Sequence, residues 1–128
     1  MIGYVMLGTN HLQETVKFYD KVLEPLGMIR VYLNDYSAAY APKSQRSHIE
    51  LYITKPFDGN DATIGNGSMV AFEVEKKSQV DLFHITALQS GGTNEGYPGN
   101  RPNENDPYYA YARDPDGNKL CAYSNEQD

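Results

Sequence analysis

The stretch that decides the fold lies near the end of the chain, at residues 113–123, and reads RDPDGNKLCAY. Its first half has the composition of a tight turn, because Asp and Pro begin turns and Gly adopts backbone angles that other residues avoid. Its second half has the composition of a β-strand. The sequence therefore predicts a hairpin that joins strands at 108–113 and 118–123. Cys121, the single cysteine of the chain, falls inside the second strand.

This hairpin has a counterpart earlier in the chain. The triplet AYA occurs at 39–41 and again at 110–112, and IELY at 49–52 aligns with LCAY at 120–123, both with a shift of 71 residues (110 − 39 and 120 − 49). A shared shift over a whole hairpin indicates an internal duplication. We therefore expect one domain, residues 1–128, made of two β-α-β-β-β modules at about 1–56 and 68–124, with a linker between them.

Each module also contains one helix with an apolar side. Asn10 is expected to cap the first helix and Ser78 the second, which ends near residue 89. Val16 matches Val80 with a shift of only 64 residues (80 − 16), so the extra residues of the second module fall in the Gly-rich segment before Pro107. We interpret that segment as an inserted loop. The remaining strands are expected at 2–8, 28–33, 37–41, 48–54 and 68–74.

Alternation along these strands divides their side chains between two faces. One face is aliphatic and is expected to pack beneath the helices: Val5, Leu7, Ile49, Leu51, Ile53, Val70, Phe72, Val74, Leu120 and Ala122. The other, called the mixed face below, is polar, aromatic and thioether-rich: Tyr4, Met6, His48, Glu50, Tyr52, Met69, Ala71, Glu73, Cys121 and Tyr123. Because no third helix is available to cover it, the mixed face is expected to line a cavity or an interface.

Composition narrows the classes of partner. The chain has 128 residues, 40% of them hydrophobic, and a formal net charge of −6. The acidic balance and the lack of a basic stripe argue against nucleic acid and against anionic membrane surfaces. No apolar run approaches the roughly 20 residues of a membrane helix. A single cysteine fits a reducing compartment, so we expect a cytoplasmic protein.

Three segments together resemble the vicinal oxygen chelate superfamily, the glyoxalase / bleomycin resistance protein / extradiol dioxygenase group. They are FYDKVLEPLGM in the first helix, GNGSMVAFEV at the start of module two, and RDPDGNKLCAY. The resemblance implies an α+β fold in which two βαβββ modules form a curved mixed sheet around a cup, with the helices on the outer face. It also implies a homodimer and, in the family's enzymes, a divalent metal in the cup.

The family's metal-ligand positions are mostly changed in this chain. The resemblance places Tyr4 and Met69 where relatives have His, and Cys121 where they have Glu, whereas Glu50 matches an acidic ligand. The late loop, where relatives carry His-x-His after Arg-Pro, has Asn103 and Asn105. We therefore expect no metal cofactor. A zinc site built from His48, Glu50 and Cys121 stays open as an alternative.

Two residues are candidates for catalysis. Cys121 is a potential nucleophile if His48 lowers the pKa of its thiol, and Glu50 is a potential general base or hydrogen-bond anchor. The competing interpretation is that Cys121 is a small buried apolar side chain. Candidate ligand-binding residues gather on the mixed face and in the late loop: Tyr4, His48, Glu50, Tyr52, Met69, Arg101, Asn103, Asn105, Tyr109, Cys121 and Tyr123. Arg101 is included because a guanidinium can hold an anionic group by a forked contact.

These observations favour a metal-free binder of a small organic molecule, of the glyoxalase or bleomycin-resistance kind, as the function. A divalent-metal-dependent lyase or dioxygenase with an altered ligand set is the first alternative. A non-catalytic interaction module, with its mixed face buried in a homodimer, is the second.

Overall fold

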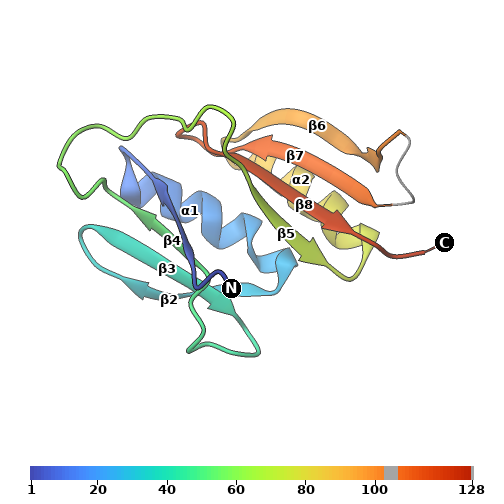
Figure 1. Ribbon diagram of the computed structural model, residues 1–128, viewed down its shortest axis with the longest axis horizontal. Helices are drawn as coiled ribbons and strands as arrows, with labels where there is room; N and C mark the ends of the chain where they lie inside the picture. Colours follow the sequence, from blue (N-terminus) through green and yellow to red (C-terminus); the bar gives the residue numbers. More distant parts are fainter. Residues whose placement is uncertain (103–106, 128) are drawn as a thin grey trace.

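Each half of the chain folds as a strand, a helix and three further strands (Figure 1). The computed structural model describes residues 1–102 and 107–127. Module one contains β1 (Val5–Gly8), α1 (Leu12–Val22), the single turn η1 (Glu24–Leu26), β2 (Met28–Leu33), β3 (Ser37–Pro42) and β4 (Leu51–Thr54). Module two contains β5 (Val70–Val74), α2 (Lys77–Gln89), β6 (Thr93–Asn100), β7 (Tyr108–Arg113) and β8 (Lys119–Ser124). The expected α+β fold of two βαβββ modules is confirmed.

The strands of each module form their own mixed sheet. Within the described residues the two four-stranded sheets have the orders β1-β4-β3-β2 and β5-β8-β7-β6. In both, the first strand of the module pairs in parallel with the last, and the other pairs are antiparallel. The two modules thus have the same strand topology. The strands therefore form two separate sheets, with β1 and β5 as edges on either side of α1 in Figure 1, rather than one continuous sheet.

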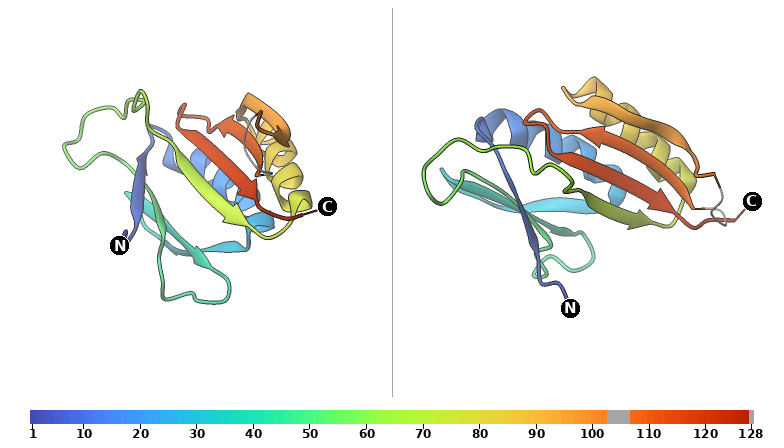
Figure 2. Two further views of the ribbon diagram at one scale, coloured as in Figure 1. Left: turned by 45° about the vertical axis from the view of Figure 1, so that its right-hand side comes forward. Right: turned by 45° about the horizontal axis from the view of Figure 1, so that its top comes forward.

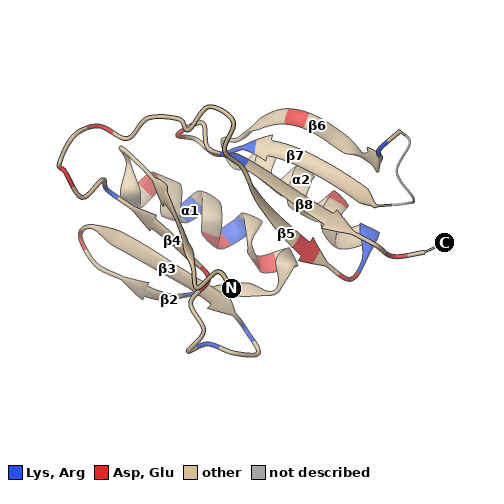
Figure 3. Cartoon of the chain, viewed as in Figure 1, with Lys and Arg blue, Asp and Glu red and all other residues tan. Residues whose placement is uncertain are grey.

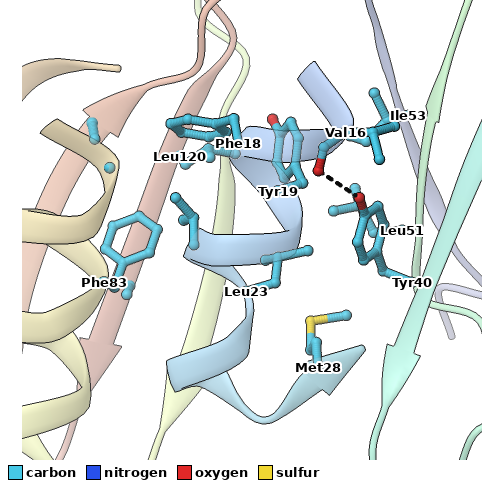
Figure 4. Close-up of a cluster of buried hydrophobic side chains, with 14 of the residues drawn as sticks. Val16, Phe18, Tyr19, Leu23, Met28, Tyr40, Leu51, Ile53, Phe83 and Leu120 are labelled. Carbon is cyan, nitrogen blue, oxygen red and sulfur yellow. Dashed lines mark hydrogen bonds between the residues drawn. The ribbon is translucent and has the colours of Figure 1, made fainter. Parts of the chain in front are cut away.

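Both helices lie on the same side of the sheets, where they contact each other (Figure 2). A single buried cluster joins the two modules, and it includes Phe18 and Tyr19 of α1, Phe83 of α2, Leu51 of β4 and Leu120 of β8 (Figure 4). The alternation predicted from the sequence explains this core, because the aliphatic side chains of the strands turn toward the helices. Neither helix is long and apolar enough to cross a membrane, in the part of the chain that the structure describes.

The DPDG turn, which joins β7 to β8 in module two, forms hydrogen bonds with module one. The carboxylate of Asp116 accepts hydrogen bonds from the hydroxyls of Thr9 (2.6 Å) and Thr15 (2.7 Å) and from the backbone N–H of Asn10 (2.9 Å). Asp114 accepts a hydrogen bond of 2.5 Å from the hydroxyl of Tyr19. The turn after β7 thus holds the segment that begins α1, and Asn10 and Asp116 are 106 residues apart in the sequence.

Four details of the sequence-based prediction are wrong. Residues 93–100, interpreted as part of a loop, form strand β6. The N-cap position of α1 is occupied by His11 instead of Asn10, and that of α2 by Lys76 instead of Ser78. The capping turn of α2 is closed by Gln79, whose side-chain oxygen accepts the Lys76 N–H at 3.0 Å. Strand β4 starts at Leu51, so His48 and Glu50 lie just before it.

Candidate functional site

The face opposite the helices has a buried floor of small side chains. Ala39, Ala41 and Cys121 are fully buried, yet they lie outside the aliphatic core cluster. In the register of the second sheet, Cys121 stands between Ala71 of β5 and Tyr111 of β7. Because its strand neighbours Leu120 and Ala122 belong to the core, alternation directs Cys121 to the mixed face, as the sequence predicted. Larger neighbours on that face cover it.

Three tyrosines of the second sheet, Tyr109, Tyr111 and Tyr123, form what we call the tyrosine cluster. The rings of Tyr109 and Tyr111 are parallel, with an interplanar angle of 2° and centroids 5.9 Å apart. Tyr109 also stacks on Tyr123 at 5.3 Å. Each ring is half-buried, so part of it stays open to solvent. The neighbouring Tyr108 instead lies against the core and donates a hydrogen bond to Asp81 of α2.

Two cations approach this cluster. Arg101 donates a hydrogen bond of 2.9 Å from Nη1 to the Tyr111 hydroxyl, and its guanidinium carbon lies 5.6 Å from the centroid of the Tyr109 ring. The Nζ atom of Lys119 lies 5.3 Å from the centroid of the Tyr111 ring. Charged residues elsewhere sit mainly on helices, loops and strand ends, and β1, β3 and β4 carry none (Figure 3). The pair of cations therefore stands out on this face.

The thiol beneath the cluster stays protonated at neutral pH. Burial raises the pKa of Cys121 to about 11, although the nearby positive charges of Arg101 and Lys119 act in the opposite direction. His48, the imidazole that a nucleophilic thiol would need, lies instead 3.6 Å from the carboxylate of Glu50 in the first sheet's part of the mixed face. The arrangement does not supply the thiolate that nucleophilic catalysis requires.

The candidates from module one form a second group. The rings of Tyr4 and Tyr52 meet edge to face with centroids 5.0 Å apart. His48 and Glu50 lie in the segment just before β4, and both are partly exposed. Met6 of β1 and Met69, just before β5 in module two, both line a hollow of about 200 Å³ between β1 and β5. Asn103 and Asn105 lie outside the described residues.

Two residues near the site were not among the sequence candidates. Tyr111 shares the parity of Tyr109, and Lys119 shares that of Cys121, so the alternation rule contained the signal for both. Tyr111 is seated there because its partner across the sheet is Gly96. A Cβ atom at Gly96 would approach Tyr111 Cδ2 to 2.7 Å. The absence of a side chain at Gly96 thus makes the room that the Tyr111 ring occupies.

The residues at the family's metal positions do not fit a divalent metal. The phenol of Tyr4 and the thioether of Met69 are poor ligands for such ions. Across residues 1–102 and 107–127, no group of three or more His, Cys, Asp or Glu side chains is placed to hold a metal ion. The residues of the mixed face can instead bind a ligand through aromatic rings, hydrogen bonds and positive charge.

Comparison with known proteins assigns the fold and the family. The model of the Glyoxalase/Bleomycin resistance protein/Dioxygenase superfamily matches residues 1–122. A glyoxalase/bleomycin resistance protein from Albidiferax ferrireducens is 39% identical, with 97% of this chain and 98% of that chain covered and a TM-score of 0.86. A glyoxalase-related enzyme from Fulvimarina pelagi shares the fold at 19% identity, with a TM-score of 0.75 and coverage of 98% of this chain and 88% of that one. No curated protein matches the chain. The family match over nearly the whole length, together with the paired βαβββ modules, shows that the chain belongs to the glyoxalase/bleomycin resistance protein/dioxygenase superfamily.

Proposed function

We propose that this protein binds a small organic molecule with a flat aromatic part on the tyrosine cluster of its mixed face, without a metal ion. The observation that carries the proposal is the row of partly open rings of Tyr109, Tyr111 and Tyr123 above the buried Cys121. Tyrosine suits such a surface because its ring is apolar and its hydroxyl is polar. Rings already aligned by the sheet lose little conformational freedom when a flat molecule stacks on them.

The chemistry of the site supports binding rather than turnover. A thiol whose pKa is about 11 is a weak nucleophile at neutral pH, and Glu50 is associated with His48 in the other sheet. The donor set at the family's metal positions offers no replacement for the divalent metal that activates substrates in metal-dependent enzymes. Binding without a metal is the function that needs none of these groups.

A pair of matched probes tests the proposal: 2-naphthoate, which is an anion, and 2-naphthamide, its neutral counterpart. Calorimetric titration is done in EDTA and again with added Mn²⁺ or Zn²⁺. We expect at least one probe to bind with the same affinity in both buffers. Replacement of Tyr123 by Leu is expected to weaken that binding roughly two- to tenfold, since an aromatic contact is worth about 0.5–1.5 kcal/mol.

Tyr97→Leu is the matched control. Tyr97 is 73% exposed and lies against His84 of α2, on the helix side, with ring centroids 5.3 Å apart. Its replacement is expected to leave the affinity unchanged. Binding that needs the metal, or that survives Tyr123→Leu, would contradict the proposal.

A second candidate function is association of two copies through the mixed face of module one. Ile2 and Tyr4 are 80% and 56% exposed there, and Met6 is 54% exposed. Apolar side chains gathered on one exposed face are typical of protein interfaces. Sedimentation velocity is expected to give a homodimer for the natural protein and a monomer for Tyr4→Lys. A monomer in both cases would remove this candidate.

The single free thiol supports a reducing compartment, and we propose the cytoplasm.

A further inference from the structure

We infer that the tyrosine cluster selects aromatic molecules that carry a negatively charged oxygen group, such as an aryl carboxylate, and that Arg101 and Lys119 hold that group beside Tyr111. The inference rests on the proposed function and specifies the class of ligand for the same site.

The geometry brings both cations to one ring. The Tyr111 centroid lies 5.9 Å from the guanidinium carbon of Arg101 and 5.3 Å from Nζ of Lys119. These are distances at which a cation is attracted by an aromatic face. A flat molecule stacked on the cluster therefore has positive charge at the Tyr111 end of its binding surface.

Both cations have donors left for a ligand. A guanidinium has five N–H donors, and Arg101 uses one of them on the Tyr111 hydroxyl. Within residues 1–102 and 107–127 the salt bridges between carboxylates and Lys or Arg are Arg30–Asp20, Lys43–Glu24 and Arg113–Glu95. Arg101 and Lys119 thus form none with the described carboxylates. The Arg101 fork suits the two oxygens of a carboxylate.

The charged residues around the cluster differ between its Tyr123 end and its Tyr111 end. Glu73 of β5 pairs with Tyr123 of β8, at the end of the cluster that is far from Tyr111. Its carboxylate accepts a hydrogen bond from Asn125 at 3.1 Å. Glu95, the acidic residue on β6, is bound by Arg113, and the hydrogen bond and positive charge of Arg113 and, to a smaller extent, the charge of Lys119 lower the pKa of its carboxyl. An anionic group is therefore repelled at the Tyr123 end and attracted at the Tyr111 end. In a protein of net charge −6, such a local positive region needs a specific arrangement of side chains.

The test compares 2-naphthoate with 2-naphthamide on four proteins at low salt: the natural chain, Arg101→Gln, Lys119→Gln and Arg46→Gln. Arg46 is exposed in the turn between β3 and β4, so its replacement removes the same charge away from the site. We expect the natural protein to bind the acid roughly tenfold or more tightly than the amide, as charge-assisted hydrogen bonds are the stronger ones. Arg101→Gln and Lys119→Gln should each weaken the acid about fivefold and leave the amide within about twofold. Arg46→Gln should behave as the natural protein.

Arg101→Lys separates charge from packing, because it keeps the cation and loses the fork. Partial recovery of acid binding in that variant supports the inference. Equal affinity for acid and amide in the natural protein overturns the inference and leaves the proposed function standing. Equal weakening of both probes by Arg101→Gln also overturns it, since the arginine would then act by packing alone. Binding of neither probe overturns both proposals.

Discussion

Cys121 shows how position sets the chemistry of a single side chain. It occupies the middle of β8, faces away from the helices beside Tyr111 of β7 and is nevertheless fully buried. Because water is excluded, the charged thiolate is disfavoured and the pKa rises to about 11. The lone thiol of the sequence thus behaves as a small apolar side chain in the floor of the site.

Alkylation of Cys121 by iodoacetamide is therefore expected to be slow at neutral pH. An ordinary thiol has a pKa of about 8.5, so at pH 7.5 the folded protein should contain about 300-fold less thiolate than an exposed cysteine would. The rate should keep rising with pH beyond 10. Intact-mass spectrometry over a series of pH values measures it, and the same chain in guanidinium chloride is the control, with ordinary reactivity. A half-maximal rate below pH 8.5 in the folded protein would restore Cys121 as a candidate nucleophile.

At the scale of elements, β6 determines where the tyrosine cluster stands. Its Gly96 lies opposite Tyr111 and leaves room for that ring, whereas Gly99 lies opposite Tyr109 with open space around it. The same strand thus offers one glycine that the site requires and one that it does not.

Gly96→Ala is expected to push the Tyr111 ring aside, because the new Cβ atom would lie 2.7 Å from Cδ2. Overpacking of this kind costs about 1–3 kcal/mol, and the displaced ring should also weaken binding of 2-naphthoate. Urea unfolding and calorimetric titration measure the two effects. In Gly99→Ala, the matched control, both quantities should stay close to those of the natural protein. Equal effects of the two substitutions would show that the Tyr111 contact is not the cause.

Strand alternation is the part of the structure that the sequence predicted well, and β6 is the part that it did not. Alternation depends only on the geometry of the strand, so it assigned Cys121, Tyr109 and Tyr123 to one face correctly. The segment TNEGYPGN at 93–100 has the composition of a loop. It forms a strand only because β7 pairs with it, through two shifts of register. Such pairing is tertiary and leaves no local pattern.

The start of α1 failed as a prediction for a related reason. Asn10 is a good capping residue by composition, but its side chain accepts the N–H of Ala62 at 2.7 Å and donates to the Ala62 carbonyl at 3.1 Å. The backbone N–H of Asn10 is bound by Asp116 instead. Contacts that the linker and the other module make with Asn10 cannot be inferred from the residues that flank the helix. For the same reason the approach of Arg101 to Tyr111 was beyond a sequence argument, although Arg101 itself was a candidate.

At the scale of the whole molecule, the DPDG turn joins the modules. Asp116→Ala removes the acceptor for Thr9, Asn10 and Thr15 at the start of α1, where a negative charge is also favoured by the helix dipole. We expect it to lower the free energy of unfolding by about 2 kcal/mol, since hydrogen bonds to charged groups contribute about 1.5–3 kcal/mol. Urea denaturation should still give one transition, because the two modules share a core.

Asp35→Ala is the control for this change, because Asp35 is exposed in the turn between β2 and β3. Its replacement should alter the free energy of unfolding by less than about 0.5 kcal/mol. If Asp116→Ala were as mild as this control, the turn would not be a fastening between the modules. Two separate transitions in Asp116→Ala would show instead that the shared core is too weak to couple them.

One edge strand of each sheet, β2 and β6, carries irregular pairing: the register shifts between Arg30 and Tyr32 in β2, and twice between Asn94 and Gly99 in β6. A foreign strand that adds to a sheet needs an even row of backbone donors and acceptors, and a bulge interrupts that row. Pro98 removes one further donor from β6. These two borders are thereby poor templates for the addition of a strand from another copy of the chain, whereas β1 and β5 pair without a register shift.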